Sequence, residues 1–344
     1  MKFEHVYPDA KTDEIFLSEF YVRKDSKLQE CASCGSMTRW FDLTFIDFSC
    51  SQECCSYVME SFKKGDITFG NNDYDFDKMS EKIKEELKLA LLFDDEWKDI
   101  IIVVKDQLIY FKQCIESIQK YTKKYHLYIW DNGSNVETQN YIENLIASIE
   151  LKEDSDVRIT SCRSEENTGF IFPNNELIAL AENPYVILLN SDTKVFQNWD
   201  KVMIGFLKSN HDVSQVGYLG GFLDENARGF GGGYGLEVDY IPGWCFCINR
   251  KTYEKYGLFN DELKFAYFED SDFSLRLKEN GNKIYSLYSS LVYHYQNKTL
   301  NSVAQENGKS VFFNETNLHN QEYFKNKWKN YLENDRITLK RSSS

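Results

Sequence analysis

Apolar and polar residues alternate along the middle of the chain with two different periods. Apolar runs of strand length occur at 99–104, 126–131, 157–160 and 185–190. Between them, apolar residues recur every three or four positions, as in a helix, at 108–121, 136–149 and 174–182. Strands that alternate with helices indicate βαβ units. We therefore predict an α/β fold with a mostly parallel sheet flanked by helices.

The pattern changes on both sides of this region. Residues 1–70 are rich in Cys and aromatic side chains, and a turn-rich break at Gly70-Asn71-Asn72-Asp73 follows them. An amphipathic helix is predicted at 78–93. The expected organisation has four parts, which are a Cys-rich module at 1–70, a linker helix at 71–97, the α/β domain at 98–300 and a helical tail at 301–344.

The cysteines of the first module come in pairs. Cys31 and Cys34 are separated by two residues, and Cys50 and Cys54 form a second pair further along. Four thiolates at this spacing are typical of a closed, tetrahedral structural zinc site, so we predict a bound Zn²⁺. A disulfide is the alternative, and it is disfavoured in a reducing compartment.

Net charge and hydropathy limit the cellular locations and the classes of binding partner that we expect. The 344 residues carry a formal net charge of −14, which repels nucleic acid and anionic lipid. No apolar run reaches the roughly 18–20 residues that span a bilayer, and no basic start precedes a long apolar run. We expect a cytoplasmic protein. The basic-aromatic run 322–331 leaves a peripheral membrane contact as an alternative to packing on the main domain.

Carboxylate side chains are clustered at two places in the sequence that suit metal binding or proton transfer. One is Asn190-Ser191-Asp192 at the end of an apolar run, and the other is Glu269-Asp270-Ser271-Asp272 before an apolar-periodic segment. One acidic site can hold a divalent metal, and the other can take a proton. The second run also suits a helix start, where carboxylates favour the helix dipole. The pair predicts metal-assisted group transfer.

Six motifs in a fixed order carry a family resemblance. They are Trp130-Asp131-Asn132-Gly133-Ser134, Asn167-Thr168-Gly169-Phe170, Leu188-Leu189-Asn190-Ser191-Asp192-Thr193, Pro242-Gly243-Trp244-Cys245, Gly257-Leu258-Phe259-Asn260-Asp261 and Phe268-Glu269-Asp270-Ser271-Asp272. This order resembles the family 2 glycosyltransferases of the GT-A fold, in their rhamnosyltransferase-like branch. The resemblance covers about residues 98–297.

The resemblance implies a nucleotide-sugar donor and a Mn²⁺ or Mg²⁺ ion. Asp192 matches the last carboxylate of the family's DxD motif, with Asn190 in place of the first, and His294 matches a residue that completes the metal site. Asp131 matches the residue that reads the nucleotide base, which favours UDP- or dTDP-sugars. Asn167 joins Asn190 among the expected donor contacts. The usual Thr-Tyr-Asn after the first strand is replaced here by Val103-Val104-Lys105-Asp106.

The resemblance also assigns the acceptor side. Asp270 matches the catalytic base of an inverting transfer of a hexosyl or deoxyhexosyl group, and Trp244 and Glu269 are expected to contact the acceptor. Asp272 is expected to orient neighbouring groups. Apart from the resemblance, Arg276 is expected to be a structural helix residue, with a phosphate contact as the alternative. The Gly-rich segment 229–235 is followed by no Gly-Lys-Ser/Thr, so it is expected to form a flexible loop near the acceptor side and not a P-loop. A glycan is the expected acceptor.

Other interpretations of the sequence remain open. The acceptor could instead be a modified nucleic-acid base or a protein, as for a virus-type enzyme. A sugar nucleotidyltransferase would need a Gly-rich phosphate grip that the sequence lacks. The third alternative is a non-catalytic protein that binds nucleotide sugar and zinc.

Overall fold

The computed structural model describes residues 22–30, 37–42, 47–48, 76–93, 95–150, 156–295 and 310–337. The chain divides into two units, Met1–Lys88 with Tyr288–Leu291, and Leu89–Leu287 with Val292–Ser344. The four cysteines of the predicted zinc site, Cys31, Cys34, Cys50 and Cys54, lie outside the described residues. No helix in the described parts of the chain is long and apolar enough to cross a membrane.

The first unit contains a small antiparallel sheet and most of one helix. Strands β1 (Val22–Glu30), β2 (Met37–Asp42) and β3 (Asp47–Phe48) pair in that order. Helix α3 runs from Phe76 to Leu92, close to the predicted 78–93. Its Glu86 carboxylate accepts hydrogen bonds from the backbone N–H groups of Tyr288 and Ser289 at 2.9 and 2.8 Å.

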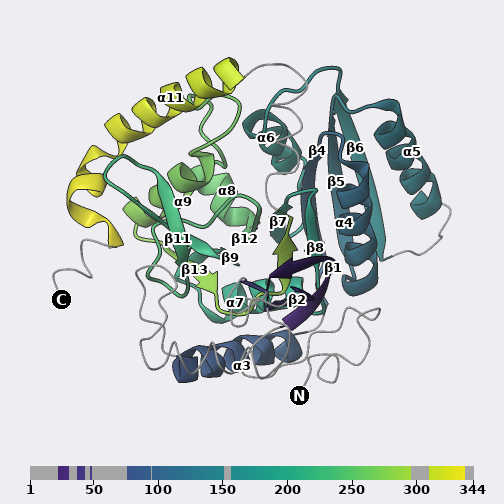
Figure 1. The fold of residues 1–344 in the computed structure, drawn as a ribbon, viewed down its shortest axis with the longest axis horizontal. Coiled ribbons are helices and arrows are strands. Elements are labelled where there is room, and N and C mark those ends of the chain that lie inside the picture. Colours follow the sequence, from purple (N-terminus) through teal and green to yellow (C-terminus); the bar gives the residue numbers. More distant parts are fainter. Residues whose placement is uncertain are drawn as a thin grey trace. The chain divides into compact units, whose positions relative to one another are not determined.

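A seven-stranded sheet organises the second unit (Figure 1). Its order is β13-β9-β12-β7-β4-β5-β6. The strands are β4 (Lys98–Val104), β5 (Tyr125–Asn132), β6 (Val157–Ser164), β7 (Tyr185–Leu189), β9 (Val213–Tyr218), β12 (Cys245–Asn249) and β13 (Lys283–Leu287). Only β12 runs antiparallel to its neighbours in this sheet. The predicted α/β fold with a mostly parallel sheet is therefore confirmed.

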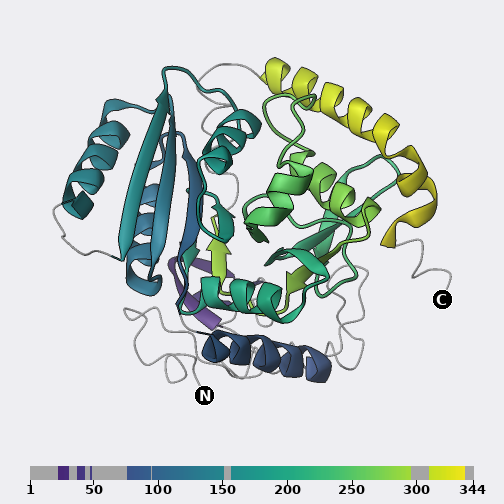
Figure 2. The same cartoon turned by 180° about the vertical axis from the view of Figure 1, so that it is seen from behind.

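Helices cover both faces of this sheet (Figure 2). They are α4 (Leu108–Tyr121), α5 (Val136–Glu150), α6 (Ile171–Ala179), α7 (Trp199–Ser209), α8 (Arg250–Tyr256) and α9 (Glu269–Glu279). Helices α4 and α5 lie on one face and α6 on the other, as right-handed crossovers require when the strand order reverses at β4. Because both faces are covered, β7 is buried at all five positions.

Sequence and structure differ most at the sheet edge and at one helix. The strand predicted at 157–160 extends to Ser164, because β6 pairs in parallel with β5 along its whole length. Its residues alternate between half-buried and exposed, so the apolar run understates its length. Helix α6 begins at Ile171 rather than 174, since Pro173 is tolerated in a first helical turn.

The Gly-rich segment forms a strand and not the expected flexible loop. Strand β11 (Gly229–Gly233) pairs antiparallel with β10 (Gly220–Leu223). The absence of side chains gives room to Tyr240, since a Cβ on Gly229 would lie 2.2 Å from its hydroxyl oxygen. The prediction is wrong because glycine was taken as a sign of flexibility, whereas here it permits close packing.

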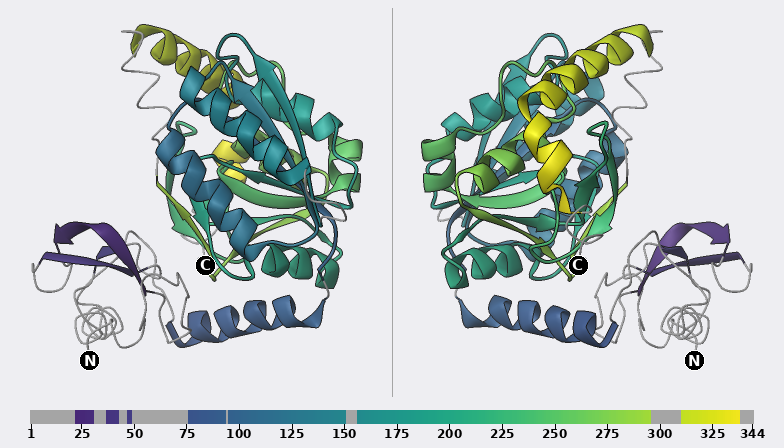
Figure 3. Two further views of the ribbon diagram at one scale, coloured as in Figure 1. Left: turned by 90° about the vertical axis from the view of Figure 1, so that its right-hand side faces the viewer. Right: turned by 90° about the vertical axis from the view of Figure 1, so that its left-hand side faces the viewer.

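The C-terminal segment packs against the second unit (Figure 3). Helix α11 (Ser310–Lys327) and the π-helical turn η1 (Tyr331–Asp335) run along the side of the unit that holds α9. Phe324, Trp328 and Leu332 form a buried cluster with Leu223 and Leu275. The tail is thus part of the domain core.

Candidate functional site

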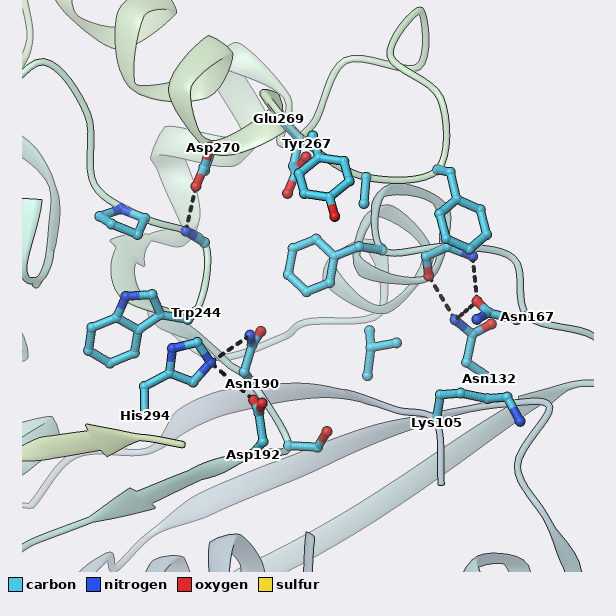
Figure 4. Close-up of a pocket in the computed structure, with 18 residues that line it drawn as sticks. Lys105, Asn132, Asn167, Asn190, Asp192, Trp244, Tyr267, Glu269, Asp270 and His294 are labelled. Carbon is cyan, nitrogen blue, oxygen red and sulfur yellow. Dashed lines mark hydrogen bonds and ion pairs between the residues drawn. The ribbon is translucent and has the colours of Figure 1, made fainter. Parts of the chain in front are cut away.

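A pocket of about 240 Å³ opens at the carboxyl ends of β4, β5 and β7 (Figure 4). In sheets of this kind ligands bind at that edge. The lining comprises Val103, Lys105, Asn132, Asn167, Gly169, Phe170, Asn190, Ser191, Asp192, Pro242, Gly243, Trp244, Phe265, Ala266, Tyr267, Glu269, Asp270 and His294. Seven of the eight predicted site residues in the described chain therefore meet in one cavity, and Asp131 is the exception.

One wall of the pocket, here called the donor wall, consists of Asn190, Asp192, Trp244 and His294. The antiparallel pairing of β8 (Thr193–Val195) with β14 (Val292–His294) places His294 opposite Thr193. As a result His294 Nε2 lies 3.1 Å from Asp192 Oδ1 and 3.5 Å from the Asn190 side-chain amide. Asp192 is 3% exposed, so its carboxylate is fixed next to the imidazole.

The donor-wall geometry fits a metal shared with a bound substrate. Among the described residues no group of three or more His, Cys, Asp or Glu side chains could hold an ion alone. Asp192 and His294 nevertheless converge within ligand distance of a common point. Mg²⁺-like ions are commonly bound by one or two carboxylates together with substrate phosphates and water. A carboxylate with an imidazole suits Mn²⁺ as well.

Trp244 holds the donor wall together. Its ring stacks on that of His294, with centroids 5.2 Å apart and planes inclined by 11°. Its carbonyl accepts the N–H of Asn190 at 2.8 Å, which continues the pairing of β12 with β7 beyond the strands. The Trp244 ring is thereby fixed at one side of the pocket, next to the predicted metal ligands (Figure 4).

The opposite wall, here called the acceptor wall, is the segment 264–270 that leads into α9. Phe265, Tyr267 and Phe268 all have positive φ, at 63°, 81° and 70°. Bulky residues rarely adopt this left-handed region, and each instance costs about 1–3 kcal/mol. Strain of this kind is retained where surrounding contacts enforce it, and it is common at functional sites.

Asp270 presents its carboxylate to the pocket from the first turn of α9. Oδ2 accepts the N–H of Gly243 at 2.9 Å, and Oδ1 accepts the N–H of Ser271 at 2.6 Å. Burial raises the pKa of Asp270, and these hydrogen bonds act in the opposite direction. A carboxylate with a raised pKa that is held in one orientation suits a general base.

Glu269 is the least satisfied carboxyl group in the pocket. It is 7% exposed, and within the described chain no partner lies within hydrogen-bond distance of its Oε2. Burial, and next the charge of Asp270, raise the pKa of Glu269 to about 8. A raised pKa favours the protonated form of the carboxyl group, which can both donate and accept a hydrogen bond.

Residues 99–273 match the profile of glycosyl transferase family 2, which covers half of the chain. The chain belongs to glycosyl transferase family 2. The predicted family is thus confirmed, and the predicted GT-A-type fold agrees with the sheet and its flanking helices. No curated protein sequence matches the chain.

Solved glycosyltransferase structures resemble the chain in fold alone. GalNAc-T7, crystallised with UDP, GalNAc and Mn²⁺, has a TM-score of 0.50 and 15% identity over 58% of this chain and 44% of that one. The mannosyltransferase PcManGT from Pyrobaculum calidifontis, in complex with GDP-Man and Mn²⁺, has a TM-score of 0.46 and 12% identity over 60% and 65%. S. aureus TarS with UDP-GlcNAc has a TM-score of 0.45 and 18% identity over 57% of each chain. The chain spans less than two thirds of each of these three structures.

Asp131 lies beside the family 2 pocket and not in its lining. Its Oδ1 accepts the N–H of Ser134 at 2.8 Å, and its Oδ2 is paired with the Arg163 guanidinium. Successive strand residues point to opposite faces, so the next residue of β5, Asn132, lines the pocket instead. Both contacts of Asp131 bind it to the loop that follows β5 and to the neighbouring strand.

Asn132 and Lys105 are lining residues without a predicted role. Asn132 Nδ2 donates to Asn167 Oδ1 at 2.9 Å and to the Gly169 carbonyl at 2.7 Å, which fixes Asn167 on the pocket rim. Lys105 Nζ donates to the Gly133 carbonyl at 2.9 Å and pairs with Asp106. Strand alternation after Asp131 could have indicated Asn132. The sequence at 103–106 departs from the family pattern, and this difference alone does not predict a role for Lys105.

Asp272 and Arg276 are structural, as expected for supporting groups. Asp272 is fully buried, and its Oδ2 accepts from Arg276 Nε at 2.9 Å. Its Oδ1 accepts from Lys327 Nζ at 2.7 Å and from Trp328 Nε1 at 2.9 Å. The remaining Arg276 donors bind the backbone carbonyls of Tyr256 and Leu258. Asp272 therefore joins α9 to the C-terminal helix.

Proposed function

We propose that the chain is an inverting, divalent-metal-dependent glycosyltransferase that moves a sugar from a nucleotide-sugar donor to a hydroxyl acceptor. One observation carries this proposal. The Asp192–His294 pair and the Glu269–Asp270 pair come from distant parts of the sequence and face the same cavity from opposite walls. A pocket with this polarity can hold a charged leaving group at one end and remove a proton at the other.

The donor wall would hold the ion and the diphosphate. Asp192 and His294 would be the protein ligands, with the Asn190 amide beside them. When bound, a divalent cation supplies Lewis-acid stabilisation of the charge that develops on the leaving diphosphate. Trp244 keeps His294 in its orientation by stacking on the ring. The sugar is then placed between the two walls.

Asp270 acts on the acceptor. As the acceptor oxygen bonds to the anomeric carbon, the bond from that carbon to the diphosphate oxygen breaks, and the hydroxyl proton passes to the Asp270 carboxylate. The Gly243 and Ser271 N–H groups hold the carboxylate in place during the transfer. Because base and leaving group lie on opposite walls, attack occurs from the far side and the configuration inverts.

Glu269 and the aromatic residues suit a sugar acceptor. The protonated Glu269 carboxyl has an open hydrogen-bonding oxygen, which a second acceptor hydroxyl can occupy. Trp244 and Tyr267 present flat faces of the kind that cover sugar rings (Figure 4). A glycan is therefore the proposed acceptor. The net charge of −14 weighs against the alternative of a nucleic-acid base.

Donor binding tests this proposal directly. Thermal unfolding is followed with a panel of UDP-, dTDP- and GDP-sugars, each with and without Mn²⁺. A metal-dependent rise in Tm with a UDP- or dTDP-sugar is expected, since bound ligand stabilises the folded state in proportion to RT ln(1 + [L]/Kd). Folded protein that responds to none of these donors would contradict the proposed donor site. A response to GDP-sugars alone would remove the base-reading role of Asp131.

We also propose the structural zinc site at Cys31, Cys34, Cys50 and Cys54, on the basis of the cysteine spacing alone. The test is metal analysis of protein purified without chelators. About one zinc per chain is expected. Protein that is folded and zinc-free would eliminate the site.

A further inference from the structure

The C-terminal helix carries a buried polar residue that contacts the acceptor wall. Asn320 lies on α11, outside the matched segment 99–273, and is completely inaccessible to solvent. A buried amide is costly unless all of its polar atoms find partners. In Asn320 both the carbonyl and the amino group are used, and all of the partners belong to one short loop.

Four backbone groups of that loop bind Asn320. Its Oδ1 accepts the N–H of Lys264 at 2.8 Å. Its Nδ2 donates to the carbonyls of Lys264 at 2.8 Å, Ala266 at 2.9 Å and Tyr267 at 3.3 Å. These bonds are made to backbone atoms, so they fix the path of the chain and do not depend on the side chains at these positions.

The loop that Asn320 holds is the strained part of the pocket. Phe265, Tyr267 and Phe268 are left-handed, so the segment would relax to other conformations without outside contacts. A second anchor comes from the opposite side, where the Phe265 carbonyl accepts the N–H of Phe170 at 2.6 Å and of Ile171 at 3.2 Å. Glu269 and Asp270 follow directly, and their positions depend on this path.

We propose that Asn320 is a positioning residue for the transfer reaction. It holds residues 264–268 in the left-handed path that directs Glu269 and Asp270 into the pocket, and so couples the C-terminal helix to the acceptor wall. This inference rests on the proposed function for its catalytic consequence. The donor wall makes no contact with Asn320 among those described, so donor binding is expected to be independent of it.

Two variants and two controls test the positioning role. Asn320→Ala removes all four hydrogen bonds. Asn320→Asp keeps the shape and the acceptor for Lys264 N–H but sets a carboxylate against three carbonyls. Asn317→Ala replaces the same residue type at an exposed position of α11. Leu145→Ala destabilises the protein from α5, which packs against the edge strand β6, and Leu145 belongs to neither of the hydrophobic clusters on which Phe268 of the loop packs.

Three readouts are combined on the full chain. Hydrogen exchange of peptides that cover 262–272 reports the loop. Donor affinity is measured with UDP-GlcNAc and Mn²⁺, or with the panel member that stabilises the protein most. Release of the nucleoside diphosphate from that donor, with water as acceptor, reports turnover.

Both Asn320 variants are expected to speed exchange at 262–272 and to lower kcat about 10²-fold, because a misplacement of about 1 Å costs this much. Donor Kd should stay within about twofold, since uniform donor binding is not affected. Asn317→Ala should behave like the wild type. Leu145→Ala should lower Tm without a comparable fall in kcat.

Several results would overturn the inference. Unchanged exchange at 262–272 in Asn320→Ala would show that the helix does not hold the loop. An equal loss of kcat in Leu145→Ala would show that stability alone is responsible. Faster exchange in a protein whose wild type neither binds nor cleaves any donor would instead reject the proposed function, and the positioning role would fall with it.

Discussion

The two walls of the pocket are built in different ways. The donor wall extends regular pairing, since β14 pairs with β8 and the Asn190 N–H bonds to the Trp244 carbonyl next to the β12–β7 ladder. The acceptor wall consists of left-handed backbone that is held by a side chain 56 positions away from Lys264. The sheet positions the first wall, whereas the second depends on contacts with α11 and with the start of α6. Substitutions should therefore separate the two walls.

The largest effect is expected at the end of the acceptor wall. Asp270→Asn should lower kcat about 10²–10⁴-fold, the range contributed by a general base. The amide oxygen can still accept the N–H of Gly243, so Tm and donor affinity should change little. Single-turnover transfer from the selected donor measures the effect. Glu279→Gln, on the exposed end of α9, is the matched control, and near-normal turnover of Asp270→Asn would exclude Asp270 as the base.

The donor wall should respond in binding as well as in rate. His294→Ala is expected to weaken Mn²⁺-dependent donor binding about 10–100-fold, because the imidazole is one of only two converging ligands among the described residues. Titration calorimetry with and without Mn²⁺ measures this loss. His211→Ala, at an exposed position of the second unit, serves as the control. A Kd that is unchanged in His294→Ala would place the ion elsewhere.

The position of the donor-wall residues could be predicted from the sequence, because they lie in recognisable motifs at strand ends. Asn190 and Asp192 follow an apolar run whose strand character is clear, and the parallel strands bring such ends to one edge of the sheet. Trp244, which we expected to contact the acceptor, reaches the same edge because it precedes β12, which is antiparallel to β7. Asp131 was assigned to the same edge, yet its side chain is turned to Arg163. A motif gives the position along a strand, but the side to which a residue points depends on the exact register.

The support of the acceptor wall could not be predicted in the same way. Asn320 binds backbone carbonyls, which every residue has, so its partners cannot be recognised from their residue types. The left-handed residues Phe265, Tyr267 and Phe268 are aromatic and not glycine, and nothing in their type signals the conformation. Such contacts depend on tertiary packing of α11, whose own sequence suggested only a helical tail.

The link between α9 and the C-terminal segment should affect stability more than chemistry. Asp272→Ala leaves the half-buried Arg276 and Lys327 and the buried Trp328 N–H without their shared acceptor. We expect a loss of about 2–4 kcal/mol in unfolding free energy, and each kcal/mol corresponds to about 2–4 °C in Tm. Asp212→Ala breaks an exposed pair with Lys283 and should cost under about 1 kcal/mol. Equal losses in the two variants would show that Asp272 is not a structural link.

The last prediction concerns the pH dependence of stability at the acceptor wall. The pKa of Glu269 is raised from 4.5 to about 8 in the folded protein, first by burial and then by the Asp270 charge. Between these values the folded state keeps a proton that the unfolded state has lost, so stability falls as pH rises. The slope is at most about 1.4 kcal/mol per pH unit, and above the folded pKa the loss is complete.

Glu269→Gln removes this titration while keeping the shape of the side chain. The stability of Glu269→Gln should therefore rise relative to that of the wild type between pH 5 and pH 8, by at most about 4 kcal/mol in unfolding free energy, and the difference should level off at higher pH. The charge of Asp270 contributes to the raised pKa of Glu269, so this pKa should be lower in an Asp270→Asn background. In that background, the Tm difference between the proteins with and without Glu269→Gln should therefore level off at a lower pH. A Tm difference that does not vary with pH would mean that Glu269 is ionised at neutral pH. The acceptor wall would then present two negative charges to the acceptor, and a cationic acceptor group would fit it better than a neutral hydroxyl.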